Sequence, residues 1–464
     1  MLKVKDLINQ WQTLLGNENV KYDNDSLLNY SHDETEDLSF LPEVVLKPST
    51  PQQISEILKT CNEYKIPVTP RGAGTGLSGG ALPIFGGVLL SMEKFNKIID
   101  IDEQNLQATV EPGVITQVFQ ETVAAKGLFY PPDPSSRGSC FIGGNLAESS
   151  GGPKAVKYGV TKDYVLNLEV VLPTGEIIYT GANVLKNATG YNLTQLLVGS
   201  EGTLGVITKV IFRLVPLPKL DVVMLAPFKS SEQACAAVSA IFRAGITPSA
   251  LEFMERDAID WTIKYLDLDM QLEEGIQSHL LIEVDGNDMD VLMKEAEQIY
   301  EVLSQFEVEE ILLADTSEQK AQLWKLRRNV AHGVKANSIY KEEDTVVPRA
   351  QLPQLLTGIK EIEKKYGFQT VCFGHAGDGN LHIFVIKGSL SDEDWNNKVT
   401  EGIKEIFELT VSLGGTISGE HGIGYVQKQY VHIALNEVQQ NIMKGIKAVF
   451  DPNNIMNPGK IFSK

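Results

Sequence analysis

The sequence is poor in cysteine and lacks any long apolar run. Its four cysteines, at positions 61, 140, 235 and 372, lie far apart and form no C-x-x-C pair. This spacing excludes an iron–sulfur cluster or a zinc knuckle carried by this chain alone. It also argues against a disulfide framework, so a reducing compartment is expected. No segment is apolar enough to cross a bilayer, and the first residues show no signal-peptide core.

The chain also has no excess of basic residues. Its formal net charge is −19 over 464 residues, whereas nucleic acids and anionic membrane surfaces both select basic proteins. We therefore expect no nucleic-acid partner and a cytoplasmic location, with peripheral membrane association only through a partner protein. The length is sufficient for two or three domains with cores of their own.

Glycine, by contrast, is concentrated in the stretch Pro70–Gly80, which contains five glycines. Glycine permits positive φ angles and a close approach of the backbone to a ligand, and the N–H groups of such a loop can cradle phosphate. Residues 74–79 match the dinucleotide fingerprint G-x-G-x-x-G, and Asp100 follows at a suitable distance. That fingerprint must open a helix, which the next glycines and Pro83 cannot do. The sequence therefore predicts a phosphate cradle without a Rossmann fold, and the lack of G-K-[ST] excludes a P-loop.

Hydrophobic patterns and turn residues predict the order of helices and strands. Ser49 or Thr50 caps a helix that begins at Pro51, and the prolines of segment 214–218 mark a domain boundary. Beyond this boundary, strands and helices alternate as is typical of an antiparallel sheet covered by helices on one face. Segment 143–152 is expected to be a loop. The other predicted strands are 44–47, 66–68, 88–91, 106–111, 168–172, 177–180, 222–227, 249–254, 279–285, 309–314 and 342–347, and the other predicted helices are 115–126, 230–243, 289–305, 317–333, 350–365 and 434–449.

Three of the seven histidines lie in two glycine-rich stretches, Gly374–His382 and Gly419–Gly422. Two imidazoles and a carboxylate from these stretches would suit a divalent metal such as zinc, manganese or iron, with positions left open for a substrate. The alternative is a pair of polar loops whose histidines hydrogen-bond to buried carbonyl groups. The placement of these residues at strand ends, inside glycine-rich loops, favours a ligand site.

Arg327 and Arg328 are adjacent on a predicted helix. Neighbouring helical residues point about 100° apart, so at most one of the two faces a given site. A solvated helix face is the simpler interpretation for either arginine, but a planar guanidinium is also the preferred ligand of a substrate carboxylate. Lys341 is a weaker candidate for the same site.

Taken together, these motifs resemble those of one family over almost the whole chain. The chain is similar to the FAD-linked oxidases of the vanillyl-alcohol-oxidase/p-cresol-methylhydroxylase (PCMH) class. Within that class it is similar to the catalytic subunit of glycolate oxidase and to D-lactate and D-2-hydroxyglutarate dehydrogenases. The resemblance is carried by Pro70–Gly80, Pro131–Ser136, Gly143–Gly152, Gly199–Gly205, the two histidine stretches and Asn457–Lys460.

The resemblance implies an α+β fold with three parts. A two-lobed PCMH-type FAD-binding domain would span residues 1–216. A ferredoxin-like α+β cap would span 217–425 and contain the substrate and metal site. The C-terminal helical segment 426–464 would pack back on the FAD-binding domain.

The resemblance also implies roles for individual residues. Members with covalent flavin carry a histidine in the glycine loop where this chain has Thr75, so FAD is expected to be non-covalent. The catalytic residues would be His421 as the base and Arg327 as the ligand of the substrate carboxylate, with Asn380 and Lys341 beside them, and the metal ligands would be His375, His382 and Glu420. FAD would be bound by Pro70, Arg71, Gly72, Ala73, Gly74, Thr75, Gly76, Ser78, Gly79, Pro132, Asp133, Gly143, Gly144, Asn145, Ala147, Ser149, Gly152, Tyr158, Glu201, Gly202, Gly205, Val206, Ile207 and Asn457.

The activity implied is that of an FAD-dependent 2-hydroxy acid dehydrogenase or oxidase. A hydride would move from a metal-bound D-2-hydroxy acid to flavin N5, giving the 2-oxo acid. Members that oxidise hydroxyglutarate carry a hydroxyl residue where this chain has Ala331, so D-lactate or glycolate is favoured over D-2-hydroxyglutarate. The other hypotheses are a non-catalytic flavin electron-transfer subunit of a larger complex, a metal-independent member acting on sugars, lactones or phenols, and a nicotinamide-dependent enzyme.

Because the chain has no cysteine cluster, its electrons must pass to an external acceptor. A quinone, a cytochrome, an electron-transfer flavoprotein and a separate iron–sulfur subunit all fit this requirement. The metal's identity and the oligomeric state stay open, with a homodimer as one option.

Overall fold

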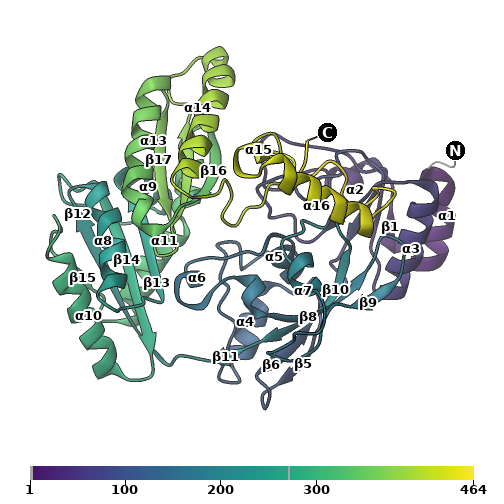
Figure 1. Ribbon diagram of the computed structural model, residues 1–464, viewed down its shortest axis with the longest axis horizontal. Helices are drawn as coiled ribbons and strands as arrows, with labels where there is room; N and C mark the ends of the chain where they lie inside the picture. Colours follow the sequence, from purple (N-terminus) through teal and green to yellow (C-terminus); the bar gives the residue numbers. More distant parts are fainter. Residues whose placement is uncertain (1–3, 270–271, 464) are drawn as a thin grey trace. The chain divides into compact units, whose positions relative to one another are not determined.

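The computed structural model describes residues 4–269 and 272–463. The chain divides into two compact units, each with sheets and helices of its own (Figure 1). Unit 1 consists of Met1–Gly151, Val160–Leu217 and Glu420–Lys464, and unit 2 consists of Gly152–Gly159 and Pro218–Gly419. The chain therefore crosses between the units at four points along its length.

Unit 1 is built on a mixed four-stranded sheet in the order β1-β2-β4-β3 and an antiparallel five-stranded sheet in the order β5-β6-β10-β8-β9. In the first sheet, β2 and β3 both run parallel to β4. A short antiparallel pair, β11-β7, is separate from both sheets. The strands are β1 (Val20–Lys21), β2 (Val44–Leu46), β3 (Val68–Arg71), β4 (Val88–Ser91), β5 (Ile98–Asp102), β6 (Gln107–Val110), β7 (Leu128–Phe129), β8 (Val165–Val171), β9 (Ile177–Tyr179), β10 (Val206–Arg213) and β11 (Val215–Pro216).

Helix α3 (Pro51–Tyr64) connects β2 to β3 and begins where the sequence predicts. The Thr50 side chain accepts a hydrogen bond from the Gln53 N–H, and Pro51 stands in the first turn. The apolar face of α3 packs in one core cluster with Trp11 of α1 and with β2, β3 and β4. The other helices of unit 1 are α1 (Val4–Leu15), α2 (Asn24–Leu28), α4 (Thr116–Ala124), α5 (Ile142–Glu148), α7 (Leu193–Leu197), α15 (Val431–Ala434), α16 (Glu437–Phe450) and the 3-10 turns η1 (Asn17–Asn19) and η2 (Thr161–Tyr164).

One glycine-rich segment differs from its prediction. Segment 143–152 is not a loop throughout, because α5 runs through its first half. Glycine is required at position 143 because an added Cβ would lie 2.8 Å from the Pro112 Cβ. Gly143 thus allows α5 to pack closely against the loop that contains Pro112. Residues 72–87, by contrast, contain no helix between β3 and β4, as predicted.

The C-terminal residues return to the first sheet of unit 1. The Val68 N–H of β3 donates to the Ile455 carbonyl at 2.8 Å, and the Asn457 N–H donates to the Val68 carbonyl at 2.7 Å. Residues 455–457 thus lie alongside the strand that leads into the glycine loop.

Unit 2 is built on one antiparallel sheet of seven strands in the order β15-β12-β14-β13-β17-β18-β16. Its long central strands pair in continuous register, for example Leu225 with Leu281 and Phe253 with Leu280. The strands are β12 (Leu220–Phe228), β13 (Ala250–Glu255), β14 (Ser278–Gly286), β15 (Leu312–Leu313), β16 (Tyr340–Val346), β17 (Gln369–Gly374) and β18 (Asn380–Ile386).

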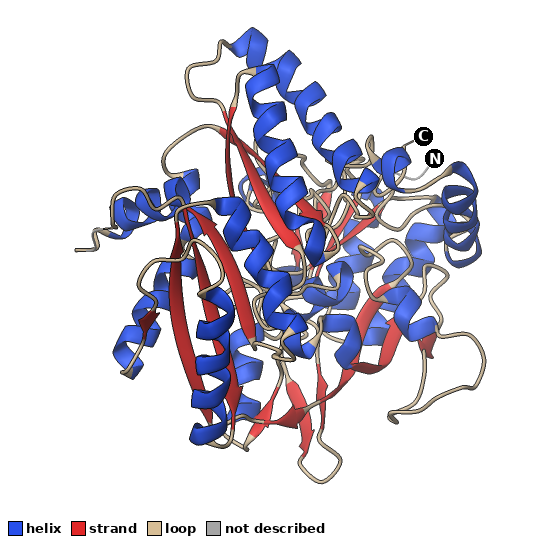
Figure 2. Ribbon diagram, turned by 60° about the vertical axis from the view of Figure 1, so that its left-hand side comes forward, coloured by secondary structure: helices blue, strands red, loops and turns tan. Residues whose placement is uncertain are grey.

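Helices cover both faces of this sheet, which corrects the expectation of one covered face. Every residue of β14 from Ser278 to Asp285 is buried, so side chains on both faces of the strand are shielded. One core cluster contains residues of α9, α11 and α12, while α8 and α10 also contact β12 and β14 (Figure 2). The helices are α6 (Ala155–Tyr158), α8 (Ser231–Arg243), α9 (Arg256–Leu266), α10 (Met289–Leu303), α11 (Ser317–Arg328), α12 (Val330–Lys335), α13 (Leu352–Tyr366), α14 (Asp392–Ser412) and the 3-10 turn η3 (Arg349–Gln351).

The helix predicted over 317–333 is broken at Asn329. This residue leaves the helical conformation at φ −101° and ψ 5°, and its side chain donates to the Lys325 carbonyl at 2.8 Å. The break places Arg327 and Arg328 in the last turn of α11. Among the described helices, none combines the length and the apolarity needed to cross a bilayer.

Candidate active site

The glycine loop follows β3 in unit 1 and takes the conformation its composition allows. Gly74 and Gly79 have φ angles of 75° and 72°. A Cβ at Gly74 would overlap the guanidinium of Arg71, which folds back over the loop. The Gly79 N–H donates to Thr35 Oγ1 at 2.7 Å. This compact turn directly after a strand is the geometry expected of a backbone anion cradle.

The C-terminal segment supports this loop through its carbonyl groups. Lys460 Nζ donates to the carbonyls of Gly79 at 2.5 Å and Leu82 at 2.7 Å, and Asn457 Nδ2 donates to the Gly80 carbonyl at 2.9 Å. These hydrogen bonds fix the backbone of the loop through its carbonyl groups. The side chain of Asn457, a residue expected to bind FAD, thus holds the backbone of the loop. The backbone of Asn457 itself has a positive φ of 40°.

Lys460 lies among acidic groups in the interior of unit 1. Burial lowers the pKa of Lys460 to about 8, although the nearby carboxylates of Asp33, Glu201 and Glu148 act in the opposite direction. Burial and then the negative charge of Glu201 raise the pKa of Glu148 well above its usual range. Acidic side chains and one lysine therefore share a buried region beneath the glycine loop.

The loop that carries Glu420 and His421 is fixed in unit 1 by the carboxylate of Glu201. This carboxylate accepts hydrogen bonds from the N–H groups of Ile423 at 2.9 Å and Gly424 at 2.6 Å. A Cβ at Gly422, which has a φ of 78°, would overlap Glu148 Oε2. The side chain of Glu201, a residue expected to bind FAD, thus holds the backbone beside His421.

The same loop is joined to two other predicted cofactor segments of unit 1. Glu420 Oε2 accepts from the Gly151 N–H at 3.1 Å. The Tyr425 N–H donates to the Ser78 carbonyl of the glycine loop at 2.8 Å. Unit 1 therefore brings the glycine loop, the segment around residue 151 and the loop of His421 to one place.

Three other predicted FAD-binding residues of unit 1 are buried or have special backbone geometry. Asn145 donates to Thr116 Oγ1 at 2.6 Å, and buried Asp133 pairs with Arg137 at 2.8 Å. Ser149 is in the left-handed region at φ 56°, a conformation that is uncommon for residues other than glycine and recurs at functional sites.

Gly152 and Tyr158, also expected to line the flavin, belong to unit 2. The Tyr158 hydroxyl donates to Asp285 Oδ1 at 2.8 Å, and Lys157 pairs with the same oxygen at 2.6 Å. Lys154 pairs with Glu283, which also accepts from Trp324 Nε1 at 2.8 Å. Residues 152–159 are thus fixed to β14 by buried charges.

In unit 2, the carboxylate of Glu252 on β13 joins two of the predicted site residues. His375 Nδ1 lies 2.8 Å from Glu252 Oε2, and Arg327 Nη2 makes an ion-pair contact of 2.6 Å with the same oxygen. Glu252 is fully buried. Burial alone would raise the pKa of Glu252, but the charges of His375 and Arg327 lower it below the usual range. The carboxylate is therefore ionised and orients both partners.

His382 on β18 lies near a second carboxylate, that of Asp344 on β16, at a longer distance. His382 Nδ1 lies 3.6 Å from Asp344 Oδ1, and the two residues are opposite each other in the β16–β18 register. Asn380 Nδ2 donates to the same Asp344 oxygen at 2.6 Å, and the Gly419 N–H donates to the other at 2.8 Å. Asp344 thus joins His382, Asn380 and the residue that precedes Glu420.

The two imidazoles are close to each other, with ring centroids 5.4 Å apart and planes at 84°. An imidazole that donates from Nδ1 to a carboxylate carries its lone pair on Nε2, which is the usual arrangement of a metal-binding histidine. The donor set of His375 and His382 therefore fits a divalent metal.

Only one of the two adjacent arginines enters this cluster, as the helical geometry predicts. Arg327 is buried and its Cζ lies 5.5 Å from the Phe373 ring, whereas Arg328 is half-buried over Trp324. Buried Arg327 Nε makes no hydrogen bond with the described residues. Lys341 lies on β16, opposite Val385 of β18 and half-buried.

Sequence reasoning missed Glu252 and Asp344. Each is a lone acidic side chain at a buried position of a strand, and a buried charge requires a partner. For Glu252 the sequence contains this indication, because the residue stands within an apolar run. It does not reveal which residue is the partner.

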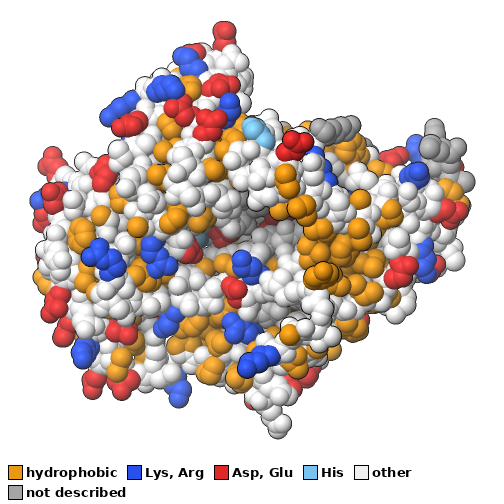
Figure 3. All heavy atoms as spheres, viewed as in Figure 1, with side chains coloured by type: hydrophobic (Ala, Val, Ile, Leu, Met, Phe, Trp, Pro, Cys, Tyr) orange, Lys and Arg blue, Asp and Glu red, His pale blue; other side chains and the backbone are white. Residues whose placement is uncertain are grey.

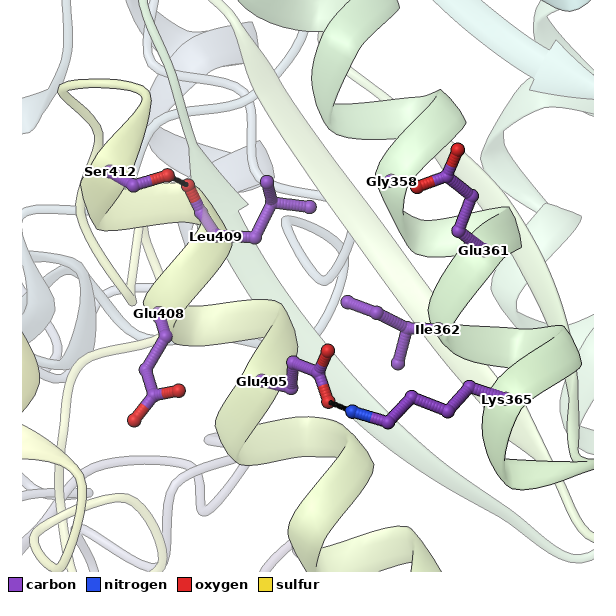
Figure 4. Close-up of a pocket in the computed structure, with 8 residues that line it drawn as sticks. All are labelled: Gly358, Glu361, Ile362, Lys365, Glu405, Glu408, Leu409 and Ser412. Carbon is purple, nitrogen blue, oxygen red and sulfur yellow. Dashed lines mark hydrogen bonds and ion pairs between the residues drawn. The ribbon is translucent and has the colours of Figure 1, made fainter.

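A groove of about 450 Å³ lies elsewhere in unit 2, between α13 and α14. It is lined by Gly358, Ile362, Leu409, the Lys365–Glu405 ion pair and neighbouring polar groups (Figure 4). None of the residues expected to bind substrate, metal or FAD lines it. The groove therefore does not change the assignment of the candidate active site.

The fold and the glycine-loop site define a flavin-dependent oxidoreductase. The family model described as FAD linked oxidases, C-terminal domain, matches residues 217–461, and the model described as FAD binding domain matches residues 42–181. The chain therefore belongs to the FAD-linked oxidase family and is an FAD-dependent oxidoreductase. This confirms the family, the α+β fold and the FAD cofactor predicted from the sequence.

Similar proteins extend over nearly the whole chain. The glycolate oxidase subunit GlcD of Bacillus subtilis is 41% identical, covering 99% of this chain and 97% of that protein. A D-lactate dehydrogenase of Anaerostipes hadrus is 40% identical, covering 91% and 90%, and a D-2-hydroxyglutarate dehydrogenase of Stutzerimonas stutzeri is 32% identical, covering 98% and 99%. The solved structure of p-cresol methylhydroxylase with bound substrate has a TM-score of 0.80 at 20% identity, over 98% of this chain and 96% of that one.

Proposed function

We propose that this enzyme oxidises a small D-2-hydroxy acid, of the D-lactate or glycolate type, to the 2-oxo acid. The observation that carries the proposal is the buried pair of Arg327 and His375 on one carboxylate, Glu252. It supports the proposal because a guanidinium, which can bind a carboxylate, lies next to an imidazole, which can bind a metal. The similarity to a glycolate oxidase subunit and a D-lactate dehydrogenase supports this substrate class.

Arg327 would bind the substrate carboxylate. The guanidinium has five N–H donors, and the ion-pair contact with Glu252 occupies only part of that set. Its buried Nε makes no hydrogen bond with the described residues, and a buried donor gains most from an anionic ligand. A fixed carboxylate would present one face of the substrate's Cα–H bond, which gives stereospecificity.

His375, His382 and Glu420 would hold a divalent metal, and Asn380 would lie near it through its bond to Asp344. When bound, the metal would polarise the substrate's hydroxyl group, and FAD would accept the hydride. The chain's own part is to orient the imidazoles through Glu252 and Asp344. Replacing such supporting carboxylates typically costs about 10- to 100-fold in metal affinity.

His421 would accept the proton of the substrate hydroxyl. Its loop is held by the hydrogen bonds of Glu201 to Ile423 and Gly424 and by the fit of Gly422 against Glu148. A base must keep its position within hydrogen-bonding reach of the proton it removes. The rigid loop supplies that position, and Lys341 would supply further positive charge near the substrate.

FAD would be bound without a covalent link, because Thr75 stands in the glycine loop where a histidine would be needed. Denaturation should release the flavin into the supernatant. Flavin that stays with the precipitated protein would contradict this part of the proposal.

The test of the whole proposal is anaerobic bleaching of the bound flavin. We expect D-lactate or glycolate to bleach it and L-lactate not to, and we expect a chelator to abolish bleaching that added metal restores. His421→Ala should keep FAD but lose reduction by substrate, whereas His432→Ala, an exposed histidine of α15 in the same unit, should behave as wild type. Normal reduction in His421→Ala would remove His421 from the mechanism.

D-2-Hydroxyglutarate is the second candidate substrate, favoured by the similarity to the Stutzerimonas stutzeri enzyme. Against it, Ala331 provides no hydroxyl group and packs against the apolar core of unit 2. Comparison of kcat/KM for D-lactate and D-2-hydroxyglutarate decides between them, and a clear preference for the diacid would overturn our choice.

The enzyme would pass its electrons to an external quinone, cytochrome, electron-transfer flavoprotein or iron–sulfur subunit. The name of the Bacillus subtilis relative, a glycolate oxidase subunit, is consistent with a place in a larger complex. Rapid bleaching by substrate would exclude a purely non-catalytic electron-transfer role.

A further inference from the structure

Helix α16 of unit 1 presents an apolar stripe to solvent. None of its 14 residues is buried. Val438, Ile442 and Val449 expose 68%, 60% and 81% of their surface. Together with Gly445 they are spaced by four, three and four residues, so they fall within about 60° of each other around the helix. Figure 3 shows hydrophobic side chains gathered along this helix.

The opposite side of α16 faces the body of unit 1. Lys447 Nζ donates to the carbonyls of Thr203 at 2.7 Å and Met456 at 2.8 Å and also pairs with Asp451. Lys447 lies about 160° around the helix from Val449. The stripe therefore points away from the interior of unit 1.

The order of residues along the stripe makes it complementary to itself. A two-fold axis that crosses α16 between residues 443 and 444 places Val438 opposite Val449 of a second copy. The same axis places Ile442 opposite Gly445. A Cβ added at Gly445 would meet no atom within 4 Å, so space for the isoleucine is available. A two-fold dimer requires one patch to fit itself in this way.

We propose that the α16 stripe, defined as Val438, Ile442, Gly445 and Val449, is the centre of a homodimer interface in which two copies of α16 pack antiparallel. Ile442 of each copy enters the space above Gly445 of the other. Glycine at the crossing point lets the helix axes approach closely. The proposal does not depend on the substrate or on the metal.

The net charge of the chain works against self-association, so the contact surface itself must be uncharged. Two copies that each carry a net charge of −19 repel each other. The four stripe residues are uncharged, so contact between them adds no further repulsion. Because salt screens the repulsion between the copies, the dimer should become tighter as ionic strength rises.

The test is sedimentation of the FAD-loaded full chain over a range of concentrations. Wild type should be a dimer, and Ile442→Glu should raise the dimer Kd by roughly a hundredfold or more, because each dimer loses two buried isoleucines. Val118→Glu, at an exposed valine of α4 in the same unit, should leave the Kd unchanged. Flavin content and the unfolding temperature report that each variant is folded.

Two further variants distinguish the proposed fit from general stickiness. Gly445→Leu adds apolar surface and helix propensity but fills the space for Ile442, so it should also weaken the dimer. The swap I442G/G445I puts an isoleucine back opposite a glycine under the two-fold axis and should restore it. Monomeric wild type, a dimer unaffected by Ile442→Glu, or a Gly445→Leu dimer as tight as wild type would each overturn the proposal; a monomer that associates only with a different subunit would show that the stripe has another partner.

Discussion

The carboxylate of Glu252 offers the most direct test of how the candidate site is built. Glu252 is fully buried and contacts both His375 and Arg327. The change Glu252→Gln keeps the shape of the side chain but removes its charge and replaces one acceptor by an N–H₂ donor. That donor would face either the guanidinium, which accepts no hydrogen bond, or the imidazole, whose Nδ1 could accept only if its proton moved to Nε2, the nitrogen needed for a metal.

The expected cost follows from the loss of a buried ion pair. Removing one partner of such a pair typically costs about 3–5 kcal/mol, because the other charge stays buried. Glutamine keeps one acceptor oxygen, so we expect a loss of about 3 kcal/mol in the free energy of unfolding. If His375 binds a metal, its affinity should also fall by about 10- to 100-fold, because Nδ1 loses its carboxylate.

The assay combines urea unfolding, metal titration of the chelated protein and steady-state kinetics. We expect Glu252→Gln to keep full FAD content, since the change lies in unit 2 away from the glycine loop's own contacts. The value of kcat/KM should fall by about a hundredfold or more because both the arginine and the imidazole lose orientation.

Glu255→Gln on the same strand is the matched control. Glu255 is also buried and also ion-paired, with Lys360 at 3.0 Å, but it touches none of the predicted site residues. It should lower stability while leaving kcat/KM and metal affinity unchanged. Wild-type metal affinity and kcat/KM in Glu252→Gln, or an equal loss of kcat/KM in both variants, would refute the role assigned to Glu252.

Other predictions concern unit 1. Gly422→Ala should lower kcat more than tenfold, because the added Cβ would overlap the Glu148 carboxylate and shift the His421 loop. The control is Gly127→Ala, which has φ 73° and open space around it and should cost only about 1–2 kcal/mol in stability. Lys460→Met should weaken FAD binding about tenfold or more, measured by fluorescence titration, because loop carbonyls lose their donor. Because burial lowers the pKa of Lys460 from 10.5 to about 8, the folded apoprotein binds fewer protons than the unfolded chain between about pH 8 and pH 10.5. Stability should therefore rise with pH through this window, and this rise should be absent in Lys460→Met.

Features encoded in local sequence were the ones that could be predicted. Helix α3 is specified by its cap and its apolar spacing within 15 residues, and the structure confirms it. The helix-free glycine loop is likewise a local property of its composition. Helix α14 was not anticipated, although Ser391 caps it and Trp395, Val399 and Ile403 mark a periodic buried face. The sequence therefore contained enough information to predict this helix.

The supporting carboxylates could not be predicted in the same way. Glu252 and His375 are separated by 123 positions, and Glu201 and Ile423 by 222. Only the order of strands in the sheet, or the return of the C-terminal segment to unit 1, brings such residues together. A lone glutamate in the sequence shows that a partner is needed, but tertiary structure decides which residue it is.

The two units use the same physical device to hold their predicted functional residues. In unit 1 the ionisable side chain of Glu201 accepts two backbone N–H groups beside His421, and in unit 2 Glu252 orients an imidazole and a guanidinium. Burial of a carboxylate is unfavourable unless all its partners are in place. Displacement of His375, Arg327 or the His421 loop would therefore leave an unsatisfied buried acid, so the geometry of the site and the stability of the surrounding fold depend on the same contacts.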